Sequence, residues 1–251
     1  MNHGISILFR AIPLVMALFC FSYGACVYAA GDDPARLTAG PVIFFLGSIC
    51  TALYCTASTI IRQIIGTYNE AARYLFPTVA YAFALTTLVC GLFIASTGNA
   101  GSYVAGHAVC GLGLITACVA TAATASTRFS LIPLNSSATP GTINARGFGR
   151  GTVAALIAVP VIMSLAAWVW TAMLFITGTT AAHTVAGSVM AGIACVCTSL
   201  VALVASIARQ VRGSYGSRER ARWSSLVLVM GGAAFLFGLV MIFARWGGAT
   251  D

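Results

Sequence analysis

Histidine is the residue type in this sequence best suited to sense pH, because its side chain changes charge between about pH 5 and 8. Two of the three histidines, His107 and His183, stand near the start of apolar runs that follow short polar turns. The spacing of the runs places both at the same membrane face. We predict that they are pH-responsive groups. The alternative is an interfacial histidine that is hydrogen-bonded to a loop carbonyl.

Other reactive groups are sparse within the apolar runs. The carboxylates all fall in connections or in the tail, at Asp32, Asp33, Glu70, Glu219 and Asp251. Ion-coupled transporters commonly use an intramembrane carboxylate, so a carboxylate proton relay is not expected. Cys195 and Cys197 are two residues apart and face different sides of a helix, which argues against a metal pair. We therefore predict no catalytic residues, no enzymatic activity, no metal site and no cofactor.

The amino-acid composition indicates whether the protein folds in water or in a lipid bilayer. Hydrophobic residues make up 59% and charged residues 7% of the 251 residues, whereas a soluble domain carries roughly 25% charged residues. An excess of apolar side chains is stable in a bilayer, where backbone groups must be hydrogen-bonded within helices. The sequence predicts an all-α integral membrane protein that forms a single polytopic domain over residues 1–251.

Seven apolar runs of membrane-spanning length predict seven transmembrane helices. They cover approximately residues 5–28, 38–61, 74–94, 103–126, 152–176, 184–207 and 223–243. A signal peptide cleaved before Ala30 is the alternative for the first run, but an internal repeat that includes this run favours a retained helix. The segments 62–73, 129–151 and 209–222 are predicted to be polar connections.

The arginines predict the orientation of the helices. All 13 basic residues are arginine, and 11 fall at the N-terminus and in the second, fourth and sixth connections, leaving only Arg36 and Arg245 on the other side. The positive-inside rule therefore predicts a cytoplasmic N-terminus and a C-terminus on the opposite side. No basic-aromatic module accompanies the charge, so nucleic acid is not an expected partner. The basic segment 209–222 suits anionic lipid head groups or serves as a topology signal.

A proline and an Ala-Gly pair recur at nearly constant distance. The pairs are Pro13 with Gly40, Pro77 with Gly106 and Pro160 with Gly187, separated by 27, 29 and 27 residues. The recurrence predicts three parallel two-helix repeats at approximately 5–61, 74–126 and 152–207, with an extra helix at 223–243. Gly113 belongs to a ridge of small residues that favours close helix packing. The expected partners are membrane lipids. The extra helix is the first half of a fourth hairpin whose second half either has been lost or is supplied by another subunit, which would be a second copy or another membrane protein.

Three segments together resemble one known family. Residues 9–20, the stretch from Tyr103 to His107 with its glycine-rich continuation, and residues 131–135 are similar to the YhiM-like family of bacterial inner-membrane proteins. The resemblance covers most of the chain. It implies a multi-pass protein of the bacterial inner membrane, in which the orientation predicted from the arginines makes the C-terminus periplasmic. It also implies a role in acid resistance or envelope stress, and it offers no established catalytic residue.

The chain departs from the family pattern at two positions. The family repeats an Ala-Gly-His entry, of which only His107 is kept here, because Pro41 and Ser188 occupy the matching places. His183 matches a second outer histidine. A mechanism that needs a ring of histidines is therefore in doubt. Our leading hypothesis is a non-enzymatic protein that contributes to acid or envelope stress tolerance. A channel or transporter for a small solute or protons is the second hypothesis, and a membrane enzyme the third.

Overall fold

The computed structural model describes residues 3–31, 33–65, 67, 69–128, 150–211 and 217–247. Every regular element in these ranges is an α-helix. The helices are α1 (His3–Ala29), α2 (Pro34–Ile64), α3 (Glu70–Ala95), α4 (Ala100–Arg128), α5 (Arg150–Thr177), α6 (Ala181–Val211) and α7 (Ser217–Gly247). All seven are long and apolar enough to cross a membrane, so the predicted all-α membrane class is confirmed.

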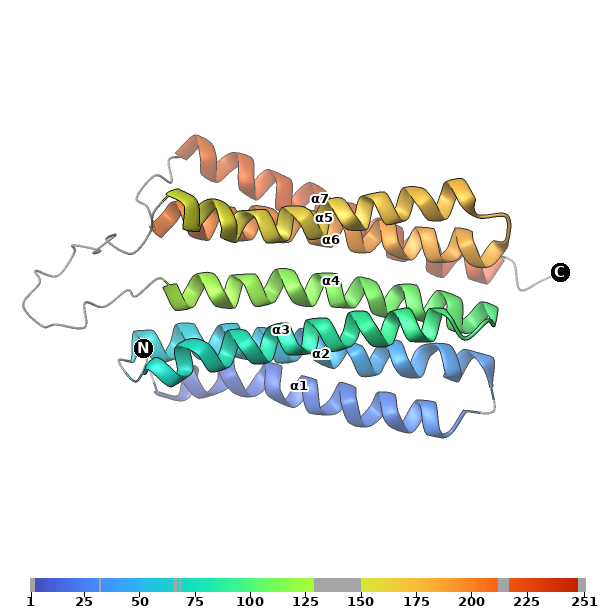
Figure 1. The fold of residues 1–251 in the computed structure, drawn as a ribbon, viewed down its shortest axis with the longest axis horizontal. Coiled ribbons are helices and arrows are strands. Elements are labelled where there is room, and N and C mark those ends of the chain that lie inside the picture. Colours follow the sequence, from blue (N-terminus) through green and yellow to red (C-terminus); the bar gives the residue numbers. More distant parts are fainter. Residues whose placement is uncertain are drawn as a thin grey trace, which may run out of the picture.

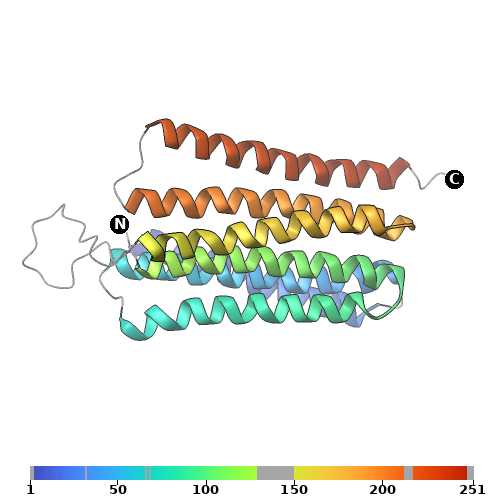
Figure 2. The same ribbon diagram turned by 45° about the horizontal axis from the view of Figure 1, so that its top comes forward.

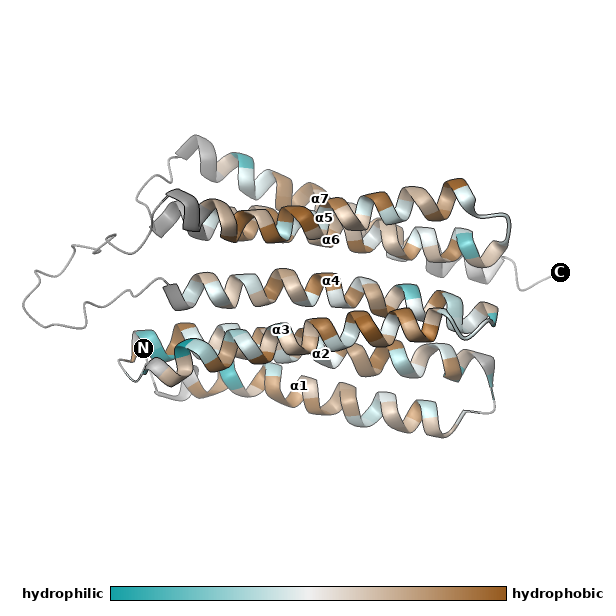
Figure 3. Cartoon of the chain, viewed as in Figure 1, coloured by the Kyte–Doolittle hydropathy of each residue, from teal (hydrophilic) through white to brown (hydrophobic). Residues whose placement is uncertain are grey.

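The helices extend beyond the apolar runs that predicted them. The segment 209–222 was predicted to be a connection, but α6 continues to Val211 and α7 begins at Ser217. The candidate membrane spans of these two helices, Ala181–Ser206 and Ala221–Leu239, still leave most of this segment between them, so it connects two spans although part of it is helical. Arginine and glutamate are good helix formers, so a helix can continue past the apolar span into polar surroundings. Figure 3 shows that the most hydrophilic described residues gather toward the two ends of the bundle.

The chain runs up and down through the bundle, so that consecutive helices are antiparallel (Figure 1). One end carries the short turns near residues 30–33, 96–99 and 178–180, and is called here the short-turn end. Helix α1 begins at the other end, and α7 ends near the short-turn end. The turn before α4 contains Gly98 at φ +90°, a left-handed conformation that favours glycine.

Helix α4 forms the centre of the bundle. It packs against α2, α3, α5 and α6, and 89% of its most apolar stretch is buried, whereas the corresponding stretch of α7 is not buried at all. Helix α7 packs chiefly on α6 and lies at the edge of the bundle (Figures 1 and 2). The peripheral helices expose large apolar side chains such as Phe93, Leu165 and Leu228. These faces suit contact with lipid.

Small residues allow the helices of each hairpin to approach closely. A Cβ atom added to Gly40 would lie 2.9 Å from the backbone nitrogen of Tyr28, and one added to Gly106 would lie 2.5 Å from the Cα atom of Ala95. Real Cβ atoms are essentially never closer than 3.0 Å to another heavy atom. The absence of a side chain at these two positions therefore sets the distance between the paired helices.

The matching glycine of the third hairpin, Gly187, faces the ring of Phe175. In all three hairpins the glycine therefore meets a residue 11 or 12 positions earlier in the chain. Contacts of this kind are what a duplicated two-helix unit would produce. The duplication itself stays a prediction.

Buried hydroxyl groups connect the helices in the interior. The side-chain oxygens of Ser48 in α2 and Thr87 in α3 lie 2.9 Å apart. Tyr81 in α3 contacts Thr121 in α4 at the same distance. Each such interhelical hydrogen bond contributes roughly 0.6 kcal/mol in a membrane protein. The polar contacts therefore help to fix the pairing of α2, α3 and α4, while apolar packing supplies most of the contact surface.

Candidate functional site

The imidazole of His107 is fixed by its own helix. Its Nδ1 atom lies 2.8 Å from the carbonyl oxygen of Tyr103, one turn earlier in α4. A carbonyl can only accept a hydrogen bond, so the neutral ring carries its hydrogen on Nδ1 and leaves Nε2 to take up a proton. The side chain is 7% exposed. His107 is therefore a buried imidazole that is held in one orientation by its own helix.

The second histidine lies in the first turn of α6. The Nδ1 atom of His183 is 2.7 Å from the hydroxyl oxygen of Thr180, which belongs to the turn between α5 and α6. A side chain at Gly178 would collide with the Cβ atom of His183. The glycine therefore lets the turn fold closely around the imidazole, which is half-buried.

Tyr103 brings the two histidines together. Its ring centroid lies 4.2 Å from that of His107 and 4.8 Å from that of His183. The two imidazole centroids are therefore no more than about 9 Å apart, although 76 residues separate them in the chain. We call Tyr103, His107 and His183, with the neighbouring Trp170, the histidine cluster. It joins the second hairpin to the third at the short-turn end.

Trp170 completes the cluster from α5. Its ring lies edge-on to His107, with the centroids 5.7 Å apart and an interplanar angle of 77°. An aromatic ring attracts a nearby cation through its negative face. A proton on His107 would therefore have two aromatic neighbours, Trp170 and Tyr103, and a second titratable group, His183.

The polar partners of the cluster are all neutral. Among the described residues, the ring contacts and hydrogen bonds of His107 and His183 involve no carboxylate and no arginine. The described part of the chain also contains no group of three or more metal-ligating side chains. Asp32, one of the acidic residues of the first turn, lies outside the described residues. The arrangement therefore brings two imidazoles together among aromatic and hydroxyl groups.

The other predicted site residues lie in helix interiors. Pro13, Pro77 and Pro160 are within α1, α3 and α5, and Pro160 is fully buried. A Cβ atom on Gly113 would lie 3.0 Å from the backbone nitrogen of Leu88. Together with the contacts of Gly40, Gly106 and Gly187 described above, these placements fit a role in helix packing. Of this group only Gly106, the neighbour of His107 in the chain, adjoins the histidine cluster.

The nine cysteines are free thiols. The thiol of Cys118 in α4 lies within hydrogen-bonding reach of Cys197 in α6. Cys20 and Cys50 are paired in the same way between α1 and α2. Three of these four side chains are buried. They fill space between helices as small, polarisable residues.

Sequence analysis did not single out Tyr103, Trp170 or Thr180. The four-residue spacing of Tyr103 and His107 places both on one face of a helix, and this signal could have identified the tyrosine as a partner. Thr180 stands three residues before His183, a spacing at which a turn brings a hydroxyl next to the first turn of a helix, so this contact also had a local signal. Nothing local in the sequence indicates that Trp170 contacts His107. Its role depends on how α5 packs against α4.

Comparison with known proteins agrees with the resemblance predicted from the sequence. The chain is 35% identical over 249 residues to "Inner membrane protein YhiM" of Escherichia coli (strain K12). The alignment covers 96% of this chain and 70% of that protein. No solved structure matches the chain. Residues 1–250 match the family described as "Protein of unknown function (DUF2776)", and the chain therefore belongs to that family.

Proposed function

We propose that this chain is a non-enzymatic protein of the bacterial inner membrane that responds to acid through the histidine cluster and contributes to acid or envelope stress tolerance. The printed name of its relative supports the inner-membrane location. The concentration of arginines at the N-terminal end of the bundle supports a cytoplasmic N-terminus. The short-turn end, with the histidine cluster, then faces the periplasm, where acid arrives first. Membrane lipids are its proposed partners.

The observation that carries the proposal is the convergence of His107 and His183 on one tyrosine ring. When both imidazoles are charged, two cations lie within about 9 Å of each other. At an effective dielectric constant near 20, their repulsion is roughly 2 kcal/mol or more. A doubly charged histidine cluster is therefore less stable than a neutral one by this repulsion.

The proposed consequence is a change in the packing of α4 against α6. Both helices contribute one histidine, and α5 contributes only Trp170, which does not titrate. Repulsion between the imidazoles is relieved if the first turn of α6 moves away from Tyr103. A shift of about 2 kcal/mol changes the ratio of two conformations roughly 30-fold. Acid therefore favours an open short-turn end, and neutral pH favours the packed one.

Hydrogen exchange measured by mass spectrometry tests the proposal. The purified protein in lipid nanodiscs is compared at pH 7.5 and pH 5, after correction for the intrinsic pH dependence of exchange. We expect faster exchange at acid pH in the peptides that contain the α5–α6 turn and the first turns of α6. The acid-induced increase should vanish in the double variant His107→Gln and His183→Gln, because glutamine keeps polar groups without titrating.

His3→Gln is the matched control, because it removes a histidine from the opposite end of the bundle. It should leave the acid response unchanged. A cell-based survival assay at low pH then compares the same variants. An identical hydrogen-exchange response in the parent protein and the double glutamine variant would remove the histidine cluster from the mechanism.

A further inference from the structure

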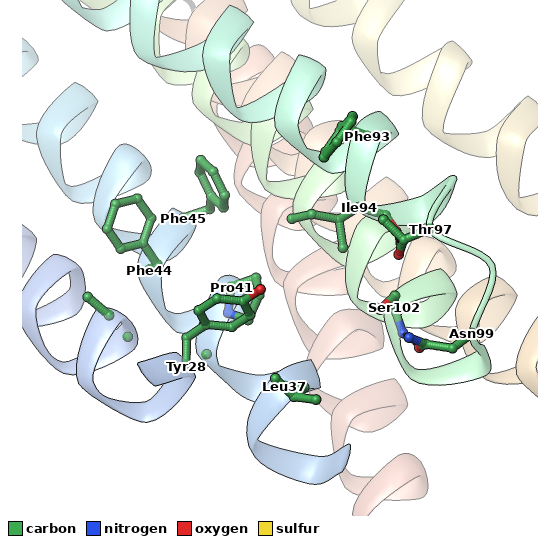
Figure 4. A pocket seen from close by; sticks show the side chains of 13 residues that line it. Tyr28, Leu37, Pro41, Phe44, Phe45, Phe93, Ile94, Thr97, Asn99 and Ser102 are labelled. Carbon is green, nitrogen blue, oxygen red and sulfur yellow. Dashed lines mark hydrogen bonds between the residues drawn. The ribbon is translucent and has the colours of Figure 1, made fainter. Parts of the chain in front are cut away.

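A cavity lies at the short-turn end, between the first and second hairpins and apart from the histidine cluster. Its volume is about 560 Å³, within the range of roughly 300–1,000 Å³ that small-molecule sites occupy. Residues of α1, α2, α3 and the start of α4 surround it (Figure 4). We call it the hairpin groove, and its principal lining residues are Tyr28, Phe44, Phe45, Phe93, Ile94 and Asn99.

Glycines form the closed side of the groove. A Cβ atom on Gly24 would lie 2.6 Å from the Cα atom of Phe44, and Gly40 faces the backbone of Tyr28. Helices α1 and α2 therefore touch through their backbones along one wall. Helix α2 packs more extensively on α4 than on α3, so space remains between the first hairpin and the end of α3. The cavity is thus a consequence of tight packing within the hairpins and looser packing between them.

The lining divides into an apolar part and a polar rim. Phe44, Phe45 and Phe93 contribute aromatic rings to the apolar part (Figure 4). Thr97, Asn99 and Ser102 lie at the rim, beside the turn between α3 and α4. No lining residue carries a formal charge. This pattern suits an amphiphile whose polar end accepts hydrogen bonds and whose tail is a hydrocarbon chain.

The groove opens toward lipid. Phe93 is 72% exposed and Tyr28 is 56% exposed, and both belong to membrane-spanning helices. The neighbouring exposed residues of α3, Val89 and Leu92, are also apolar. The medium at the opening is therefore the hydrocarbon of the bilayer, and apolar walls without an occupant would lose dispersion contacts.

We propose that the hairpin groove binds one acyl chain of a membrane phospholipid. The Oδ1 atom of Asn99 accepts a hydrogen bond from the backbone nitrogen of Ser102 at 2.6 Å, which leaves the Asn99 amide group as a donor. Thr97 donates its hydroxyl hydrogen to the carbonyl oxygen of Ile94. The rim therefore offers the Asn99 amide and the Ser102 hydroxyl to the ester carbonyl of the lipid, while the chain lies along Phe44 and Phe93.

Photolabelling tests the proposal with the intact protein. The protein is reconstituted in vesicles of phosphatidylethanolamine and phosphatidylglycerol that contain a trace of phosphatidylethanolamine with a diazirine near the ester end of one acyl chain. After illumination, labelled peptides are identified by mass spectrometry. We expect labelling of the peptides around Phe44 and Phe93 to exceed that of the lipid-facing peptide around Leu228 roughly fivefold, the ratio given by a preference of about 1 kcal/mol.

Two variants make the test specific. Ala25→Trp fills the groove and should reduce its labelling to the level of the peptide around Leu228. The matched control Ala172→Trp adds the same side chain to an exposed position of α5 and should leave groove labelling unchanged. Equal thermal unfolding midpoints for both variants establish that neither has misfolded. Asn99→Asp keeps the oxygen that caps α4 but removes the amide donor and adds a negative charge, so groove labelling should fall.

Several outcomes would overturn the inference. Equal labelling of the groove and of the peptide around Leu228 would show that the groove does not bind the lipid acyl chain in preference to the rest of the protein surface. Unchanged labelling in Ala25→Trp would place the reactive chain elsewhere, and unchanged labelling in Asn99→Asp would remove the amide from the site. None of these outcomes depends on the histidine cluster.

Discussion

Replacement of Gly106 by alanine tests whether close backbone contact holds the second hairpin together. The new Cβ atom would lie 2.5 Å from the Cα atom of Ala95, whereas ordinary van der Waals contact begins at 3.4 Å. The backbone nitrogen of Ala95 lies closer still, so helices α3 and α4 would have to separate by more than about 0.9 Å at this point. Neither group is a flexible side chain that can turn away. Overpacking of this kind costs roughly 1–3 kcal/mol, against a gain in helix propensity of about 1 kcal/mol for alanine over glycine.

We therefore expect Gly106→Ala to be destabilised by up to about 2 kcal/mol. The measurement is unfolding in mixed micelles by increasing fractions of sodium dodecyl sulfate, followed by circular dichroism. Gly231→Ala is the matched control, because no atom lies within 4 Å of the added Cβ. It should be neutral or stabilised by up to about 1 kcal/mol. Equal free energies of unfolding for the two variants would refute the argument from backbone contact.

Two further predictions concern buried side chains. The two buried oxygens of Ser48 and Thr87 lie 2.9 Å apart. A double-mutant cycle with Ser48→Ala and Thr87→Val should therefore give a coupling energy of about 0.6 kcal/mol, the average for interhelical hydrogen bonds in membrane proteins. A coupling energy of zero in the same unfolding assay would show that the contact contributes nothing. A membrane-impermeant maleimide should spare the buried Cys118 and Cys195. Reaction at either buried thiol in native membranes would instead favour the channel or transporter hypothesis, since it requires a water-filled path.

The predicted histidine site was only partly accessible to sequence analysis. The apolar runs placed His107 and His183 at the same end of the bundle, where the structure has them. Their contact through Tyr103 could not be predicted, because the distance between two hairpins depends on the packing of α4, α5 and α6. The hairpin groove escaped prediction for the same reason, since its walls come from four helices.

The sequence by itself determined that this chain has seven membrane-spanning helices, where each begins and ends to within a few residues, and which ends lie together. Those properties depend on the length of apolar runs and on short turns, which are local features. Only the tertiary structure decided that α4 is central, that Tyr103 lies between two histidines and that a groove opens beside Phe93. In lipid, every apolar helix face is equally soluble, so the lateral arrangement depends on the shapes of small residues and on a few hydrogen bonds.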